Sequence, residues 1–299
     1  MRNLFCSAAS LAICFVFLLG QEIYGQEKLR KEIENIVQTL NASVGVGIRH
    51  IESGDTLTIH GSDHFPMQSV YKFHLALAVL ADVDRGKLAL DQKVFVRKED
   101  YFPTHSPIAD KYPDGNVELT IGELLSHTVS TSDNIGCDIL FKLVGGPKTV
   151  EAYIHGLGVK DIAIVNTERE MHQDWDAQYK NWTTPQAMVQ LLYLFYQKKT
   201  LSPQSRDFLV KIMEQTSTGK NRIKGHLPAG TVAAHKTGMG GNDAGVISAM
   251  NDVGVVTLPS GGHFAIALFV TNPKDSIEAV ETVMAKISKL VFDHYAATK

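Results

Sequence analysis

Cysteine is scarce in this chain, with three residues among 299. Cys6 and Cys14 lie in the apolar N-terminal segment, so a chain that loses this segment keeps Cys137 alone. We therefore expect no disulfide within the mature chain. Cys137 stands in an apolar helical pattern, and we expect it to be a buried core residue.

Several other signals are absent. Lys and Arg number 29 against 32 Asp and Glu, and this mixed charge of −3 argues against nucleic-acid and membrane-surface roles. The twelve histidines include no His-x-His, and His60 and His64 flank Gly-Ser-Asp in a non-helical stretch, which argues against a metal hydrolase. Lys220 follows a glycine but lacks the upstream glycine of a phosphate loop. We expect neither a metal nor another cofactor.

The only long apolar run is at the N-terminus. Arg2 precedes an apolar stretch from Leu4 to Leu19, and residues 1–25 as a whole predict a signal peptide that is cleaved before Gln26. A retained membrane anchor is the alternative, because the stretch approaches spanning length. Cys14 follows an isoleucine, which argues against a lipoprotein signal. We expect a secreted, periplasmic monomer without stable membrane association after cleavage.

The apolar patterns predict an α+β fold with an antiparallel sheet and a helical lobe. The strand candidates are Val44–Ile51, Thr56–His60, Val232–Lys236, Gly245–Met250, Gly254–Leu258 and His263–Thr271, with Asn251-Asp252 as the turn between the fourth and fifth. Apolar residues three and four apart predict a first helix around Leu29–Leu40 and a last one around Ile277–Ile287. The middle of the chain reads as almost all helix. We assign 26–68 and 216–299 to an α/β lobe and 69–215 to a helical lobe, with the functional cleft between them.

A serine and a lysine stand at the start of an apolar helical pattern, in Ser69-Val70-Tyr71-Lys72. Residues three apart share a helix face, so Lys72 is within reach of the Ser69 hydroxyl. Serine needs a neighbour that takes its proton, and lysine does so only when burial or a nearby cation such as Lys236 lowers its pKa. Alone, this pair also fits a helix N-cap and a solvated lysine. Ser217 and Lys220 have the same spacing, but without the apolar helix.

Two further motifs follow in the chain. Thr120 and Glu123 predict a capping box for one helix, and Ser132-Asp133-Asn134 then fills the short connection to the next helix. Lys236-Thr237-Gly238 ends a strand, where a cation, a hydroxyl and exposed N–H groups favour a carboxylate site. Each tripeptide alone also fits an ordinary cap or strand end. Their order and their separations together indicate a serine enzyme that forms an acyl intermediate.

This triple of motifs resembles that of the serine penicillin-recognising enzymes. The resemblance extends from about the first strand to the last helix, and within that group the segment from Asn166 to His172 is similar to the omega loop of class A β-lactamases. There a glutamate holds the water that releases the acyl group, and Glu168 matches it by its distance from His172. Glu170 is the competing carboxylate. The resemblance implies a five-stranded antiparallel sheet flanked by helices, an all-helical lobe, and an omega loop at about 164–184.

The resemblance also implies roles for the matching residues. Ser69 would attack the β-lactam carbonyl, and Lys72, or Glu168 through a water, would accept its proton. Ser132 would protonate the departing ring nitrogen, and Glu168 would activate water for deacylation. The backbone N–H groups of Ser69 and Met239 would form the oxyanion hole. The implied substrate-binding residues are Asn134, Lys236, Thr237, Gly238, Met239, Arg222, His172 and His105, with Lys236 and Thr237 on the substrate carboxylate, Arg222 reaching toward it, and His105 at the cleft edge.

Three residues depart from the commonest class A pattern: Asn166 replaces an arginine that ties down the omega loop, His172 replaces an asparagine, and Met239 replaces a small or hydroxylated residue. The first two, with Arg222, resemble the PER-type and TLA-type extended-spectrum branch. We therefore predict hydrolysis of penicillins and cephalosporins, with antibiotic resistance as the result. A D-alanyl-D-alanine carboxypeptidase or other penicillin-binding protein and a penicillin sensor share the three motifs and stay as alternatives.

Overall fold

The computed structural model describes residues 25–197, 199–243 and 246–297. The predicted signal peptide, apart from its last residue, lies outside the described residues. Within these ranges, no helix is both long enough and apolar enough to cross a membrane.

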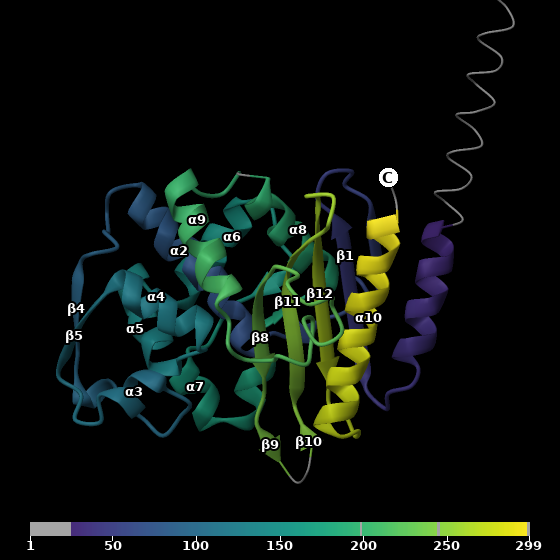
Figure 1. Cartoon of the computed structure of the whole chain (residues 1–299). Helices are drawn as coiled ribbons and strands as arrows, with labels where there is room; N and C mark the ends of the chain where they lie inside the picture. The colour runs from purple at the N-terminus through teal and green to yellow at the C-terminus, as the bar shows by residue number, and fades with distance from the viewer. Residues whose placement is uncertain (1–24, 198, 244–245, 298–299) are drawn as a thin grey trace, which may run out of the picture.

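A five-stranded antiparallel sheet forms one side of the molecule (Figure 1). The strand order is β2-β1-β12-β11-β8. The strands span Ser43–His50 (β1), Thr56–Ile59 (β2), Ala233–Met239 (β8), Ala249–Thr257 (β11) and His263–Thr271 (β12). The two ends of the chain thus supply the whole sheet, and the predicted α+β class is confirmed.

Strand β12 shows how the sheet is packed on both faces. Its side chains alternate between two hydrophobic clusters, because successive residues of a strand point to opposite faces. Phe264, Ile266, Leu268 and Val270 pack with the helix over residues 25–37 and with α10 (Ile277–Ala297), which lie side by side on one face (Figure 1). Ala265, Ala267 and Phe269 face α8 (Pro185–Tyr196) and the other helices.

The turn predicted at Asn251-Asp252 is wrong. Both residues lie inside the continuous strand β11, paired with β8 on one side and β12 on the other. The polar side chains that suggested a turn are buried and bonded: Asn251 donates to the Pro66 carbonyl at 2.8 Å, and Asp252 contacts His235. Earlier in the chain, the short strands β9 (Asn242–Asp243) and β10 (Val246–Ile247) form an antiparallel pair.

The helix that follows Ser69 lies at the centre of the helical layer. In α2 (Tyr71–Asp84) every residue from Tyr71 to Ala81 is buried, as expected for a helix that is surrounded by others. Its neighbours are α4 (Ile121–Ser130), α5 (Asn134–Val144), α6 (Pro147–Gly156) and α9 (Pro203–Glu214). The predicted capping box is present, with Thr120 accepting from the Glu123 N–H.

The middle of the chain is not as helical as predicted. Strands β4 (Lys93–Val96) and β5 (Val117–Thr120) form an antiparallel pair at the far edge of the helical layer (Figure 1). Strand β7 (Trp182–Thr183) pairs with both β3 (Phe65–Pro66) and β6 (Ile162–Ala163). The remaining short elements are η1 (Gln68–Val70), η2 (Lys98–Asp100), α3 (Pro107–Lys111), α7 (Glu168–Gln173) and η3 (Trp175–Tyr179).

Candidate active site

Ser69 lines a cavity of about 480 Å³. The cavity lies between α7 and η3 on one side and the end of β8 on the other, and its walls include six of the predicted residues: Ser69, His105, Asn134, Glu168, His172 and Met239. A slightly larger cavity of about 540 Å³, lined by Tyr196, Arg206 and His263 among others, contains none of them. The predicted residues therefore identify the 480 Å³ cavity as the candidate active site.

Ser69 is held by tertiary contacts just before it. The Met67 N–H donates to the Asn181 carbonyl at 2.8 Å, and the Met67 carbonyl accepts from the Asn251 amide at 3.0 Å. Gly238 lies so close that a Cβ there would be 2.6 Å from the Met67 carbonyl oxygen. The glycine of the third motif thus lets strand β8 approach the turn that carries Ser69.

Lys72 is fully buried and makes three polar contacts in the described chain. Its ammonium donates to the Ser132 carbonyl at 2.8 Å and to the Asn134 amide oxygen, and it lies 3.1 Å from the Glu168 carboxylate. No hydrogen bond joins it to the Ser69 hydroxyl among the residues that the structure describes. Lys72 is therefore directed at the second motif and at Glu168, not at the serine one turn before it.

The second motif joins α4 to α5, as predicted. Asp133 is the N-cap of α5 and accepts from the Gly136 N–H at 2.7 Å. Its other oxygen accepts from the Ser106 hydroxyl at 2.8 Å. Ser132 has a φ of 60°, which is uncommon for a residue other than glycine, so surrounding contacts must hold it there. The Ser132 hydroxyl accepts a hydrogen bond from the Lys236 ammonium at 2.9 Å.

Lys236 joins the third motif to the second. Its ammonium donates to the Ser132 hydroxyl and also to the Thr237 carbonyl, at 2.9 Å each. Burial holds the pKa of Lys236 well below its ordinary value, and the positive charge of Lys72 lowers it further. The Thr237 hydroxyl is hydrogen-bonded to that of Thr218 at 2.5 Å.

The structure distinguishes the two candidate carboxylates of the omega loop. Glu168 is buried in α7 and forms the ion pair with Lys72. Glu170 is exposed and closes the capping box of the same helix, accepting from the Thr167 N–H at 2.8 Å and from its hydroxyl at 3.0 Å. Of the two, only Glu168 reaches the cavity of Ser69.

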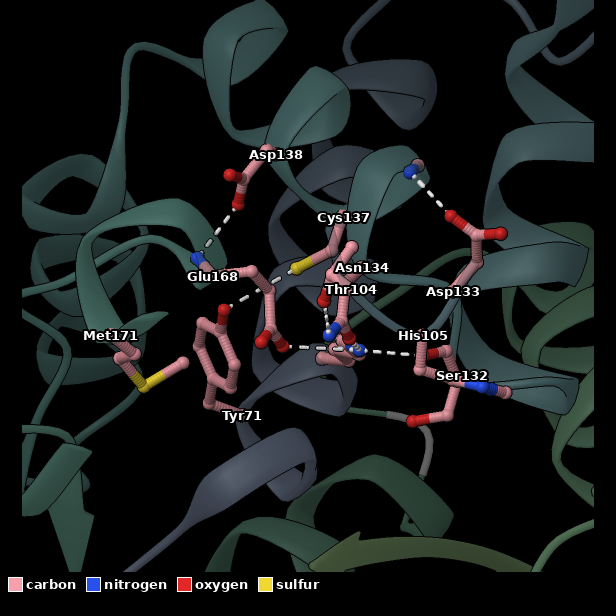
Figure 2. A network of polar contacts seen from close by, with 12 residues as sticks. Tyr71, Thr104, His105, Ser132, Asp133, Asn134, Cys137, Asp138, Glu168 and Met171 are labelled. Atoms are coloured by element: carbon pink, nitrogen blue, oxygen red, sulfur yellow. Dashed lines mark hydrogen bonds and ion pairs between the residues drawn. The ribbon is translucent and has the colours of Figure 1, made fainter. Parts of the chain in front are cut away.

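Asp138 supports Glu168, and the sequence analysis missed it. Its carboxylate accepts from the backbone N–H of Glu168 at 2.8 Å (Figure 2), and its second oxygen accepts from the N–H of Arg169 at 3.0 Å. Burial raises the pKa of Asp138 to about 6, and the Glu168 charge raises it too, while the two N–H groups act in the opposite direction. The available signal was its position four residues after Asn134, on the same face of α5.

Amide groups, not an ion pair, anchor the omega loop where Asn166 replaces the usual arginine. The side-chain oxygen of Asn181 accepts from the N–H groups of Val165, at 2.7 Å, and Asn166, at 2.9 Å. Its NH₂ group donates back to the Asn166 carbonyl at 2.8 Å, and the Asn166 side chain donates to the Ala177 carbonyl at 2.8 Å. Hydrogen bonds of the two uncharged asparagine side chains therefore hold the start of the omega loop to its end.

Thr104 connects His172 to the centre of the site. The Asn134 NH₂ group donates to the Thr104 hydroxyl at 2.6 Å, and that hydroxyl lies 3.1 Å from His172 Nε2. His172 Nδ1 is 2.9 Å from the Glu168 carbonyl. A neutral His172 with its proton on Nδ1 satisfies every contact: Nδ1 donates to Glu168 and Nε2 accepts from Thr104. The hydrogen bonds through Thr104, of which Figure 2 shows the one with Asn134, thus tie the omega loop to the opposite wall of the cleft.

The structure places the remaining predicted residues around the cavity rim and behind it. His105 is exposed at the rim, with Nε2 2.9 Å from the Thr131 carbonyl. Met239 is 45% exposed and lines the cavity. Arg222 is buried behind β8, where its guanidinium donates to the carbonyls of Gly238 at 3.0 Å and Asn251 at 2.9 Å. The Arg222 guanidinium thus forms hydrogen bonds with the backbone of strands β8 and β11.

The comparisons with known proteins identify the family of the chain. The family model of the β-lactamase enzyme family matches residues 28–295. Beta-lactamase VEB-1 of Pseudomonas aeruginosa is 46% identical over 272 residues, which cover 90% of this chain and 91% of that protein. Extended-spectrum beta-lactamase PER-1 of the same organism is 42% identical and covers 88% and 86%.

Solved structures give the same result. The crystal structure of TLA-1 extended-spectrum beta-lactamase is 49% identical to this chain and superposes with a TM-score of 0.89, covering 91% of this chain and 99% of that one. The resemblance inferred from the three motifs and the omega loop is thereby confirmed. The chain belongs to the β-lactamase enzyme family, and within it to the class A serine enzymes similar to PER-1 and TLA-1.

Proposed function

We propose that this β-lactamase is a secreted enzyme that hydrolyses penicillins and cephalosporins through an acyl-enzyme on Ser69, and so confers antibiotic resistance. One observation carries the proposal: the buried carboxylate of Glu168 lines the cavity of Ser69 and lies 3.1 Å from the buried Lys72. A proton acceptor and a second base are thereby available next to a nucleophile, which both halves of the reaction require.

Acylation begins when the Ser69 oxygen attacks the β-lactam carbonyl. Its proton goes through a water to Glu168, or to Lys72 once the Lys72 ammonium has passed a proton to Glu168 across their 3.1 Å contact. The negative charge that develops on the carbonyl oxygen is stabilised by the backbone N–H groups of Ser69 and Met239. Removing one donor of such a hole costs roughly 2.7–4 kcal/mol in other hydrolases.

Ring opening requires a proton on the departing nitrogen. Ser132 donates it and is reprotonated from the Lys236 ammonium, whose hydrogen bond to the Ser132 hydroxyl is 2.9 Å long. Lys236 and the hydroxyl of Thr237 hold the substrate carboxylate at the same end of the cleft. Arg222 supports this site from behind, through the Gly238 carbonyl.

Deacylation separates a hydrolase from a penicillin-binding protein. Glu168 removes a proton from the water that attacks the ester, and the water oxygen forms the new bond as the Ser69 oxygen leaves. Asp138 and His172 hold the backbone of Glu168 in place. A general base in position contributes typically 100- to 10,000-fold, which is enough to convert a stable acyl-enzyme into a transient one.

We propose activity on extended-spectrum cephalosporins as well. The support is the similarity to PER-1 and TLA-1, both described as extended-spectrum enzymes, together with the open rim at Met239 and His105. Asn134 and the end of strand β8 would bind the amide side chain of the substrate between them. Secretion rests on the sequence of residues 1–25, and a monomer is the expected state.

The test is turnover of a chromogenic cephalosporin by the purified mature chain, with the acyl-enzyme counted by mass spectrometry. The parent should make many turnovers per site. Glu168→Gln should label with penicillin and accumulate acyl-enzyme, whereas Ser69→Ala should not label. Glu170→Gln is the matched control, since it makes the same change two residues away at an exposed cap, and it should turn over normally.

Other results would point to other functions. A single stoichiometric burst from the parent that stays bound would make the chain a penicillin-binding protein or a sensor. Normal turnover by the Glu168 variant would remove this residue from deacylation. Accumulation of acyl-enzyme in the Glu170 variant instead would exchange the roles of the two carboxylates.

A further inference from the structure

Trp175 in the omega loop is a large apolar side chain that the mechanism above does not use. It is the first residue of η3, it is 38% exposed, and it lines the cavity of Ser69. A large aromatic side chain buries about 150–250 Å² when it is fully covered, so a partly exposed one gives up part of that stabilisation. The indole therefore offers apolar surface to a ligand that occupies the cavity.

The chain has one other tryptophan, and its surroundings differ. Trp182 in β7 stacks on His64, with ring centroids 3.5 Å apart and an angle of 13° between the rings. Trp182 does not line the cavity of Ser69. Trp175 has no such aromatic partner among the described residues. One tryptophan thus packs within the fold, and the other faces the cavity.

The indole of Trp175 lies against the backbone that follows strand β8. A Cβ built on Gly241, two residues after the end of this strand, would be 3.2 Å from Cζ3 of the indole. In the described chain, that indole is the only group that such a Cβ would meet within 4 Å. Glycine at position 241 therefore lets the ring and the backbone approach each other, and the indole joins the omega loop to this wall of the cavity.

Buried side chains hold the backbone beneath this ring. The Gln178 NH₂ group donates to the Trp175 carbonyl at 2.8 Å. The Gln178 side-chain oxygen accepts from the Gln68 NH₂ group at 2.9 Å and from the Ser248 hydroxyl. Gln68 directly precedes Ser69, so these bonds link the backbone of Trp175 to the turn that carries the serine. A wall that is ordered in advance costs less entropy on binding than one that the ligand must order.

The cavity wall at Trp175 favours an uncharged ligand group. Asp174 and Asp176, its neighbours in the chain, do not line the cavity, and Met239 at the end of β8 adds a half-exposed thioether. Among the described residues of the cavity, Glu168 is the one carboxylate, and it is paired with a buried lysine. An uncharged aromatic ring suits this wall, because it stacks on an indole in an offset or edge-to-face arrangement.

We propose that Trp175 is a specificity-determining residue, whose indole stacks on an aromatic ring in the acylamino side chain of the substrate. The enzyme therefore prefers β-lactams with an aromatic side chain to those that carry an alkyl chain on the same nucleus. This inference rests on the proposed function, because it requires that a β-lactam acylates Ser69. The ring is bound in the same way before and during the reaction, so the contact lowers KM more than it raises kcat.

The test compares two penicillins, one with a benzyl and one with a linear alkyl side chain. The readout is the ratio of their kcat/KM values, in which the fraction of active enzyme cancels. Trp175→Leu keeps an apolar side chain without the ring and should lower this ratio about fivefold, mainly through KM of the benzyl substrate. Trp175→Phe keeps a ring and should retain most of the ratio. Trp182→Phe is the matched control outside the cavity and should leave the ratio unchanged.

A second measurement leaves Trp175 in place and so covers a failure of Trp175→Leu to fold. In the double variant Glu168→Gln and Trp182→Phe, Trp175 is the only tryptophan, and the acyl-enzyme holds the side chain of the substrate in the cavity. Acylation by the benzyl penicillin should shift the tryptophan emission to shorter wavelength, because the covered indole loses contact with water. The alkyl penicillin should shift it less. Mass spectrometry checks that acylation is complete.

An unchanged ratio in Trp175→Leu would overturn the inference, because equal losses for both substrates would mean that Trp175 only supports the omega loop. An emission that does not respond to the benzyl acyl group would overturn it as well. If the parent fails to make repeated turnovers, the proposed function fails. If the parent turns over and neither the ratio nor the emission responds, the inference alone fails.

Discussion

His74 should make the folded protein lose stability in mild acid. It lies near the start of α2, fully buried, and neither ring nitrogen makes a hydrogen bond of ordinary length among the described residues. Burial lowers the pKa of His74 from 6.5 to about 4, and a backbone contact with Val70 offsets this only in part. The neutral ring is therefore strongly preferred in the folded state.

The sign of the effect follows from proton binding. Between the two pKa values the unfolded chain binds more protons at His74 than the folded chain does, so stability falls as the pH falls. With pKa values of 6.5 unfolded and about 4 folded, the loss is about 2 kcal/mol between pH 7.5 and pH 5. Below pH 4 the full loss is about 3 kcal/mol.

The perturbation is His74→Leu, followed by urea unfolding of the mature chain at pH 7.5, 6 and 5. The variant should lose about 2 kcal/mol less than the parent over this range. At pH 7.5 it should be about as stable as the parent or more stable, since it removes a buried unpaired polar group. Asp138, with its raised pKa, stabilises the folded state as the pH falls, but parent and variant share this contribution, so their difference isolates His74.

The exposed His226 provides the control, and His226→Leu should leave the pH dependence unchanged. Parallel pH profiles for the parent and His74→Leu would refute the reasoning. A loss of several kcal/mol at pH 7.5 would refute it as well, because it would mean that the ring has a hydrogen-bond partner in the folded state.

Three further predictions concern the cleft. Thr104→Val removes the hydroxyl between Asn134 and His172 and should lower kcat/KM about tenfold, which corresponds to the loss of a net hydrogen bond of about 1.4 kcal/mol. Thr104→Ser keeps the hydroxyl and should retain activity. An equal loss of kcat/KM in both variants would make the effect steric. Cys137, buried with a pKa well above its ordinary value, should react with a thiol reagent only at the rate of unfolding, measured by absorbance with and without urea. Asn181→Ala leaves the backbone N–H groups of Val165 and Asn166 without their acceptor and should lower the free energy of unfolding, measured in urea, by on the order of 2 kcal/mol. A stability equal to that of the parent would show that the omega loop has another anchor.

Some of the site was predictable because its chemistry is local. A serine and a lysine three residues apart at the start of an apolar helix, an N-cap tripeptide and a strand-end Lys-Thr-Gly are each read from neighbouring residues. The spacing between Glu168 and His172 also separated Glu168 from Glu170, and the structure brings Glu168 to Lys72. The lobe boundaries at 68/69 and 215/216 stay a prediction.

Other parts of the fold were misread for equally local reasons. Asn251-Asp252 has the composition of a turn, and only hydrogen bonds from other segments, to the Asn251 NH₂ group and the Asp252 carboxylate, hold the two side chains inside a strand. The pairing of β4 with β5 joins short strands across an intervening segment that has no repeating pattern. Local propensity says little about such pairs, because packing decides them.

By itself, the sequence determined the family and the helices and strands with strong apolar periods, because these depend on residue type and short spacing, and it supplied Ser69 as the candidate nucleophile. Only the tertiary structure decided that Lys72 faces Glu168 and Asn134, that Asp138 and Thr104 hold the omega loop, and that Arg222 faces the strand backbone. The physical reason is that each of these contacts joins groups that are from 16 residues (Arg222 to Gly238) to 96 residues (Lys72 to Glu168) apart in the chain, a separation that no local pattern encodes.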